Sequence, residues 1–224
     1  MSDYDEVLGL EIHNLLVSKK LETPFLYQSQ CLTVETKISM ITDCFQDVLT
    51  NLGMDLKDPS IQDTPRRLAK MYVNELCGNL DPAKFPRCTR LPNEMAYDEI
   101  VLVRDIEVKS LCEHHFVPID GFAHVAYLPG PVVIGLSKIN RVVSYFARRP
   151  QIQERLTEQV SLALRHVLQT DDVAVILTAK HYCVKFRGVE DPCSDTTTSK
   201  IAGKFKDNTA LRAELLALIN QGRH

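Results

Sequence analysis

The sequence predicts an α+β fold, in which an antiparallel sheet domain follows a helical N-terminal region. Three observations lead to this prediction. Amphipathic helical periodicity dominates the first 94 residues. Four stretches typical of strands follow in two pairs, with two helical stretches between the pairs. The pattern changes from helix to strand near residue 95, so we expect a helical region over 1–94 and a sheet domain over 95–224.

The helical region contains three stretches with apolar residues at helical spacing. These stretches cover residues 3–18, 35–52 and about 65–76. Gly53 ends the second helix, because glycine is favoured just after the last helical turn. Thr64 is the expected N-cap of the third helix, with Pro65 at the first helical position. Residues 81–93 contain Pro and Asn and are predicted to form a loop.

The sheet domain alternates pairs of strands with helices. The expected strands are 98–110, 115–128, 171–187 and a Thr-rich stretch at 195–199. The expected helices are 138–148, 151–168 and 208–219. Pro150 separates the first two of these helices. This order favours an antiparallel sheet with helices packed against it.

Thiols and imidazoles gather in two short segments that lie far apart in the chain. The segments are LCEHHF at 111–116 and HYC at 181–183. Cys112 and His115 have the spacing of a chelating turn, and Cys183 is a candidate third ligand. Three protein ligands leave a fourth tetrahedral position for water, which is typical of catalytic zinc sites. His114 and His181 remain as a candidate acid and base.

The predicted strand 171–187 places several of these side chains together. Side chains alternate along a strand, so residues two apart share a face. On this strand the shared face would carry His181, Cys183, Lys185 and Arg187. An ordinary alternative is that the thiols are buried and the histidines are packed polar residues.

Two helix starts carry cations, although the helix dipole disfavours positive charge there. In the first, Arg66 and Arg67 occupy the first turn and Lys70 lies one turn further on. In the second, Ser137 is a plausible N-cap, and Lys138 and Arg141 share the outer face. A bound phosphate would neutralise these charges, and so would an acidic neighbour.

Glu154 lies in the first turn of the helix that follows Pro150. Its carboxylate is favourable next to the positive end of the helix dipole. It could also accept two parallel hydrogen bonds from a guanine edge, and nothing within the sequence separates these two roles.

Composition excludes several classes of function. The net charge of −3 argues against a general nucleic-acid-binding surface. Seven irregularly spaced cysteines do not form a secreted disulfide framework. An acidic N-terminus argues against a signal peptide, and no stretch is long and apolar enough to span a bilayer. We therefore expect a cytoplasmic protein that binds neither nucleic acid nor membrane.

Taken together, the motifs closely resemble those of GTP cyclohydrolase I. The matching stretches are TPRRLAKMY at 64–72, CEHHF at 112–116, VIGLSKINR at 133–141, RPQIQERL at 149–156 and HYCVK at 181–185. The resemblance covers roughly residues 35–220. It implies zinc-dependent hydrolysis of GTP at C8, release of formate and rearrangement to 7,8-dihydroneopterin triphosphate, the first step of tetrahydrofolate and pterin biosynthesis.

The resemblance also implies roles for individual residues. One zinc ion per subunit would be held by Cys112, His115 and Cys183 and would lower the pKa of a water that attacks C8. His181 would protonate the leaving ring nitrogen, while His114 would serve the later sugar steps with Ser137 close to the ribose. Substrate contacts would come from Glu154 at the guanine, from Gln153 and Leu136, and from Arg67, Lys70, Lys138, Arg141 and Arg187 at the triphosphate.

The resemblance further implies the tunnelling fold, an antiparallel four-stranded sheet with two helices on one face. Subunits of this family form a decamer of two pentameric rings with shared active sites, and some family members are allosteric. The same fold also occurs in a pterin synthase with three histidine ligands and in a nitrile reductase without zinc. The two cysteine ligands and the cations favour the cyclohydrolase.

Other interpretations also fit the sequence. Cys193 could complete a closed four-ligand structural zinc site with the three candidate ligands, which would leave two histidines without a role. Cys112 and Cys183 could form a disulfide if metal were lost. An inactive relative that binds GTP and regulates another protein is the non-enzymatic alternative. Lys180 is an unexpected residue before His181, but by strand parity it points away from the zinc face.

Overall fold

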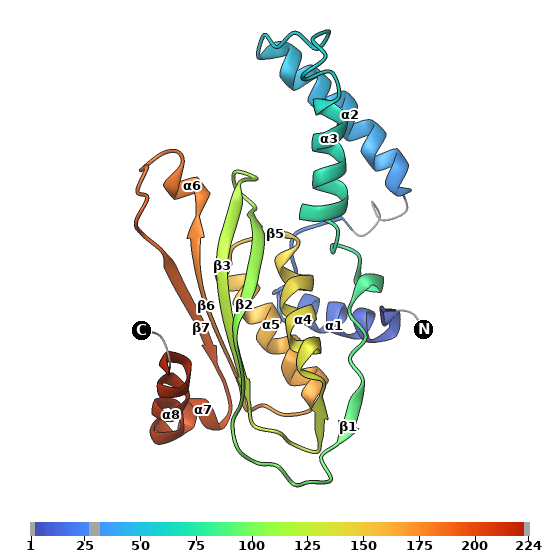
Figure 1. Ribbon diagram of the computed structural model, residues 1–224. Helices are drawn as coiled ribbons and strands as arrows, with labels where there is room; N and C mark the ends of the chain where they lie inside the picture. The colour runs from blue at the N-terminus through green and yellow to red at the C-terminus, as the bar shows by residue number, and fades with distance from the viewer. Residues whose placement is uncertain (1–2, 27–31, 222–224) are drawn as a thin grey trace. The chain divides into compact units, whose positions relative to one another are not determined.

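A computed structural model describes residues 3–26 and 32–221 of the chain (Figure 1). The chain forms two compact units, one of residues 24–81 and the other of residues 1–23 together with 82–224. These units divide the chain after residues 23 and 81, whereas the sequence predicts a domain boundary near residue 95. That boundary stays a prediction.

The unit of residues 24–81 is helical, as predicted. It contains α2 (Val34–Asn51), α3 (Thr64–Lys70) and a π-helical extension of α3, η2 (Met71–Leu76). Within it, Phe45 of α2 stacks on Tyr72 with 5.5 Å between ring centroids. The N-cap prediction for Thr64 is wrong, because Asp63 occupies that position and makes no side-chain capping bond.

The other unit is built around the predicted antiparallel sheet. Its strands have the order β5-β2-β3-β6-β7. The four main strands are β2 (Val101–Cys112), β3 (Pro118–Tyr127), β6 (Val173–His181) and β7 (Thr196–Ile201), and each is antiparallel to its neighbour. The two-residue strand β5 (Pro150–Gln151) pairs in parallel with the last two residues of β2. The sheet prediction is thus confirmed, with β5 as an unpredicted addition.

Helices α4 (Leu136–Ala147) and α5 (Gln153–Leu168) cover one face of this sheet, and α1 (Glu6–Ser18) packs beside α5 (Figure 1). Alternate strand residues point to this face, so Val125 and Val175 are fully buried in the main core. Their neighbours Ala126 and Ala174 join a smaller core on the opposite face. That second core is closed by α7 (Lys204–Asp207) and α8 (Thr209–Asn220).

Two sequence predictions about connecting segments are wrong. Residues 81–93 are not only loop, since they contain the 3-10 helix η3 (Pro82–Lys84) and the strand β1 (Arg90–Pro92). β1 pairs with β4 (Val132–Ile134) in a separate two-stranded sheet. The strand predicted over 171–187 ends at His181, and the chain continues as a short helix, α6 (Tyr182–Lys185).

Across residues 3–26 and 32–221, the structure contains no helix that combines the length and the apolar character needed to cross a membrane.

Candidate metal centre and substrate site

A tight turn at the end of β2 holds the first two candidate ligands. The N–H of Cys112 donates to the carbonyl of Val117 at 2.8 Å, and the N–H of Phe116 donates back to the carbonyl of Cys112 at 2.9 Å. Phe116 adopts φ +52°, a backbone conformation that few non-glycine residues take. The turn buries the Cys112 side chain and leaves His115 exposed to solvent.

The third candidate ligand lies at the end of β6. The register of the sheet pairs His181 with Ile119, and β3 begins one residue earlier at Pro118, just after the turn that holds His115. The end of β6 therefore lies beside the turn. Cys183 is in α6, so the prediction that His181, Cys183, Lys185 and Arg187 share one strand face is wrong.

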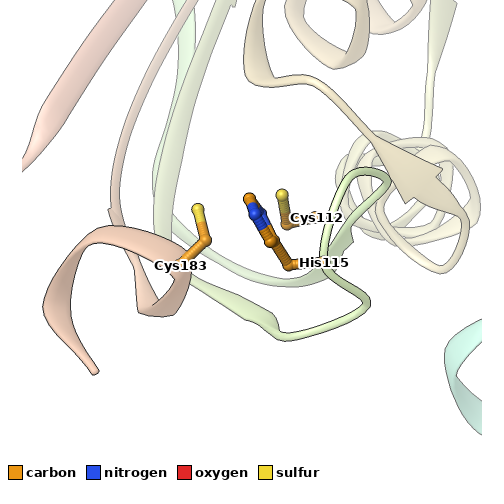
Figure 2. A group of neighbouring side chains, drawn as sticks. All are labelled: Cys112, His115 and Cys183. Carbon is orange, nitrogen blue, oxygen red and sulfur yellow. The ribbon is translucent and has the colours of Figure 1, made fainter. Parts of the chain in front are cut away.

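Cys112, His115 and Cys183 point toward one another (Figure 2), and their ligating atoms all lie within 4.8 Å of each other. Two thiols and one imidazole are a donor set that suits zinc, and three ligands leave a tetrahedral position open. Burial raises the pKa of the Cys183 thiol, and the neighbouring Cys112 raises it further. A divalent cation would reverse this trend, since coordination deprotonates a thiol.

Cys193 does not belong to this group in the described part of the chain. It is exposed, and its N–H donates to the side chain of Asp191 at 2.9 Å. The closed four-ligand site considered from the sequence therefore has no support in the geometry.

His114 is exposed and lies next to an ion pair that ties the ligand turn to α5. Its Nε2 is 3.8 Å from a carboxylate oxygen of Glu113. The same carboxylate accepts two hydrogen bonds from the guanidinium of Arg155, in the first turn of α5. Both side chains of this pair are mostly buried, with 17% and 18% of their surface exposed.

His181 is half-buried and contacts Gln153, the first residue of α5. Its Nε2 lies 2.7 Å from Oε1 of Gln153. Burial lowers the pKa of His181, and the nearby carboxylate of Glu154 acts in the opposite direction. Glu154 itself is exposed, so its carboxylate is accessible to a ligand.

The start of α4 carries a second group of predicted substrate residues. Gly135 occupies the N-cap position and Ser137 is the second helical residue, so the N-cap prediction for Ser137 is wrong. Leu136 is 59% exposed, and Ser137 is also exposed. Further along the same helix, Arg141 lies 3.4 Å from the carboxylate of Asp3.

Among the remaining predicted phosphate contacts, Lys138 is partly buried, whereas Arg187, Arg67 and Lys70 are exposed. Arg187 donates from Nη1 to Nε2 of His115 at 2.6 Å, which places it beside the candidate metal ligands. Arg67 and Lys70 belong to the unit of residues 24–81. Arg67 lies 3.8 Å from Asp63, an acidic neighbour of the kind considered as the alternative to phosphate.

Sequence reasoning missed the residues that support the site. Arg155, Glu113 and Asp3 were not predicted to take part in any interaction. The local sequence signal for Glu113 was its position between Cys112 and His114. Its partner Arg155 lies 42 residues away in the chain, so no short motif connects the two.

The chain is similar to proteins of one known family. The family model described as GTP cyclohydrolase I matches residues 41–220. A protein of Pasteurella multocida (strain Pm70) named GTP cyclohydrolase 1 is 49% identical over 211 residues, which cover 94% of this chain and 96% of the relative. Proteins of the same name from Shewanella oneidensis, 51% identical over 208 residues, and Klebsiella pneumoniae (strain 342), 49% identical over 208 residues, cover 95% and 94% of their own lengths and each 93% of this chain.

Proposed function

The chain belongs to the GTP cyclohydrolase I family, and from this we propose that it hydrolyses GTP at C8, releases formate and forms 7,8-dihydroneopterin triphosphate. This reaction would be the first step of tetrahydrofolate and pterin biosynthesis. The proposal draws its main support from the cluster of Cys112, His115 and Cys183, whose ligating atoms lie within 4.8 Å of one another.

We propose that this cluster holds one zinc ion per subunit. The donor set fits zinc, because two thiols and an imidazole are one of the three-ligand sets that hold zinc in catalytic sites. When bound, zinc would supply Lewis-acid chemistry and make a nearby water more acidic. The turn of β2 and the end of β6 already bring the three side chains together, so little rearrangement would be needed.

The surrounding residues would bind and orient GTP. Glu154 would accept hydrogen bonds from the guanine edge, because its carboxylate is exposed at the start of α5. Leu136 would provide an apolar contact from the start of α4. The triphosphate would be held by charge-assisted hydrogen bonds from Lys138, Arg141 and Arg187. The family resemblance also predicts phosphate contacts from Arg67 and Lys70, and these two contacts stay predictions from the sequence.

Two histidines would move protons. His181 lies next to a candidate ligand and would protonate the ring nitrogen that leaves when the imidazole opens. His114 would carry protons during the later sugar steps, with the Ser137 hydroxyl near the ribose. We also propose the family's decamer of two pentamers, a cytoplasmic location and allosteric behaviour, all of which stay predictions from the sequence.

The test is incubation of the purified, zinc-loaded protein with GTP while formate and pterin absorbance are followed together. We expect both signals, their loss on chelation, and their return when zinc is added back. Cys183→Ser should lose bound zinc and both signals, whereas the matched variant Cys193→Ser should keep them, since Cys193 lies outside the ligand group. GTP binding without formate release would contradict the proposed activity.

A further inference from the structure

Gln153 is the first residue of α5, and its carboxamide is held on all sides by the protein. The residue is 2% exposed. Its Nε2 group donates to the carbonyl of Leu177 in β6 at 3.1 Å and to the carbonyl of Thr196 in β7 at 2.8 Å. A third acceptor, the hydroxyl of Thr198, lies 3.2 Å away. Both amide hydrogens therefore have partners inside the sheet.

These partners fix the orientation of the carboxamide. A backbone carbonyl can only accept a hydrogen bond, so the two carbonyls of β6 and β7 must face the amide nitrogen and not its oxygen. The Oε1 atom then has to point at His181, where it lies 2.7 Å from Nε2. The usual ambiguity between the two ends of a glutamine side chain does not arise here.

The orientation of Gln153 in turn determines where His181 carries its proton. An amide oxygen can only accept, so Nε2 of His181 must be the N–H donor in this contact. In the neutral ring the other nitrogen, Nδ1, is then the one that bears a lone pair. The hydrogen bond also restrains the plane of the ring.

We propose that Gln153 is a positioning residue for His181, which holds the Nε2–H tautomer and leaves Nδ1 as the nitrogen that exchanges protons with the substrate. This inference rests on the proposed proton-transfer role of His181. It replaces the direct substrate contact expected for Gln153 from the family resemblance, because such a contact would require the bonds to β6 and β7 to break.

The packing of α5 on the sheet explains why Gln153 is able to orient His181. α5 packs against β6 and β7, and the Thr198 hydroxyl is also 2.7 Å from the hydroxyl of Thr157, one turn further along α5. The amide is thus held by two strands and its own helix. A side chain restrained in this way can orient a histidine without any movement when the substrate arrives.

A direct test is solid-state NMR of the zinc-loaded protein labelled with ¹⁵N-histidine, with the His181 signals assigned by their loss in His181→Gln. The wild-type protein at a pH where the ring is neutral should show the Nε2–H tautomer. Gln153→Met, which keeps the size of the side chain but has no amide, should show a mixture of tautomers. The opposite tautomer in the wild-type protein, or an unchanged tautomer in Gln153→Met, would overturn the proposal.

Gln159→Met is the matched control. Gln159 is a buried glutamine on the same helix, but its amide contacts Leu21, Thr23 and Gln151, away from His181. Both variants should lose stability, since each removes a buried hydrogen-bond network. Only Gln153→Met should alter the His181 tautomer.

Kinetics separate this proposal from the proposed function. We expect Gln153→Met to lower kcat for formate release about 100-fold while KM for GTP changes less than about threefold, because a misplaced general acid affects the chemical step and leaves substrate contacts intact. A large rise in KM with kcat unchanged would instead indicate direct substrate binding and overturn the positioning role. If the tautomer changes as expected but even the wild-type protein releases no formate, the proposed reaction fails while the control of the tautomer by Gln153 stands.

Discussion

Helices α4 and α5 cover the same face of the sheet, yet their first turns differ in how their side chains are used. At the start of α5, Gln153 and Arg155 are engaged with His181 and with Glu113 of the ligand turn. At the start of α4, Leu136 and Ser137 are exposed. The side chains at the start of α5 are thus held by contacts within the protein, whereas those at the start of α4 are exposed at the surface.

This difference indicates that the two helix starts have different tasks in the proposed site, one to orient groups and the other to bind substrate. The start of α5 fixes groups that, in the proposed reaction, would act on the reacting atoms, and such groups have to be held in place before the substrate binds. The start of α4 carries Lys138 near the positive end of a helix dipole, an arrangement that costs a few tenths of a kcal/mol up to about 1 kcal/mol without an anion. A triphosphate would relieve this cost, so α4 is better suited to binding than to orienting.

Breaking the ion pair of α5 should give the largest effect. Arg155→Met leaves the mostly buried carboxylate of Glu113 without its partner, which should lower the free energy of unfolding by about 2 kcal/mol. The ligand turn would also lose its connection to α5, so zinc affinity should fall about 10- to 100-fold. Denaturant unfolding and zinc competition with a chelator measure the two effects.

The double variant Arg155→Met/Glu113→Gln is the control for this experiment. It removes the orphaned charge, so most of the lost stability should return. Zinc affinity should stay low, because the glutamine cannot restore the ionic contact between the turn and α5. Wild-type zinc affinity in the Arg155→Met single variant would show that the ligand turn holds its geometry without α5.

Changing the start of α4 should have a smaller effect, and one confined to binding. Lys138→Met should raise KM for GTP about 10-fold, because one charge-assisted phosphate contact is lost, while kcat changes less than about threefold. Stability should be unchanged or slightly higher, since a cation leaves the N-terminal end of a helix. Steady-state kinetics at several salt concentrations and thermal unfolding provide the measurements.

Lys180→Met serves as the matched control for Lys138→Met. Lys180 is an exposed lysine next to His181 in β6, and its side chain should point away from the cluster. Its loss should leave KM unchanged. An equal rise in KM for both lysine variants would mean that general attraction between the protein and GTP explains the effect, without a specific site at α4.

The sequence predicted the elements of the sheet domain well because their apolar periodicity is long and regular. It failed at the end of β6, where Val184 and Phe186 continue the strand pattern although they are 37% and 83% exposed. The reason lies in the neighbouring strands. β3 begins at Pro118, which has no N–H to donate, and the pairing of β6 with β7 ends at Ala179. Beyond His181, neither β3 nor β7 continues to pair with the chain, so it turns into α6.

The metal cluster was predictable for a similar reason, since thiols and imidazoles at chelating spacing are a local signal. The supporting residues were not predictable in this way. The contact between Gln153 and His181 spans 28 residues, and that between Arg155 and Glu113 spans 42. Both depend on where the first turn of α5 lies relative to the ends of two strands, which is set by the packing of the whole domain.

The smallest expected effect concerns the contact of Asp3 with Arg141. Backbone hydrogen bonds from Arg87 to Asp3 and from Asp5 to Phe85 hold the N-terminal segment beside α4. The ion pair itself is open to water, with 47% and 80% of the two side chains exposed, so it contributes little to stability. Asp3→Asn should change the free energy of unfolding by less than about 0.5 kcal/mol. It should lower KM for GTP by no more than about threefold, because Asp3 competes only weakly with phosphate for Arg141.

Salt provides the control for this last prediction. At about 0.5 M salt the Asp3→Asn variant and the wild-type protein should have the same KM, since an exposed ion pair is screened at that ionic strength. A decrease in KM of more than about 10-fold at low salt would mean that Asp3 blocks Arg141 strongly. The cations of α4 would then be as firmly engaged by the protein as the side chains at the start of α5, and the contrast between a binding helix and an orienting helix would no longer hold.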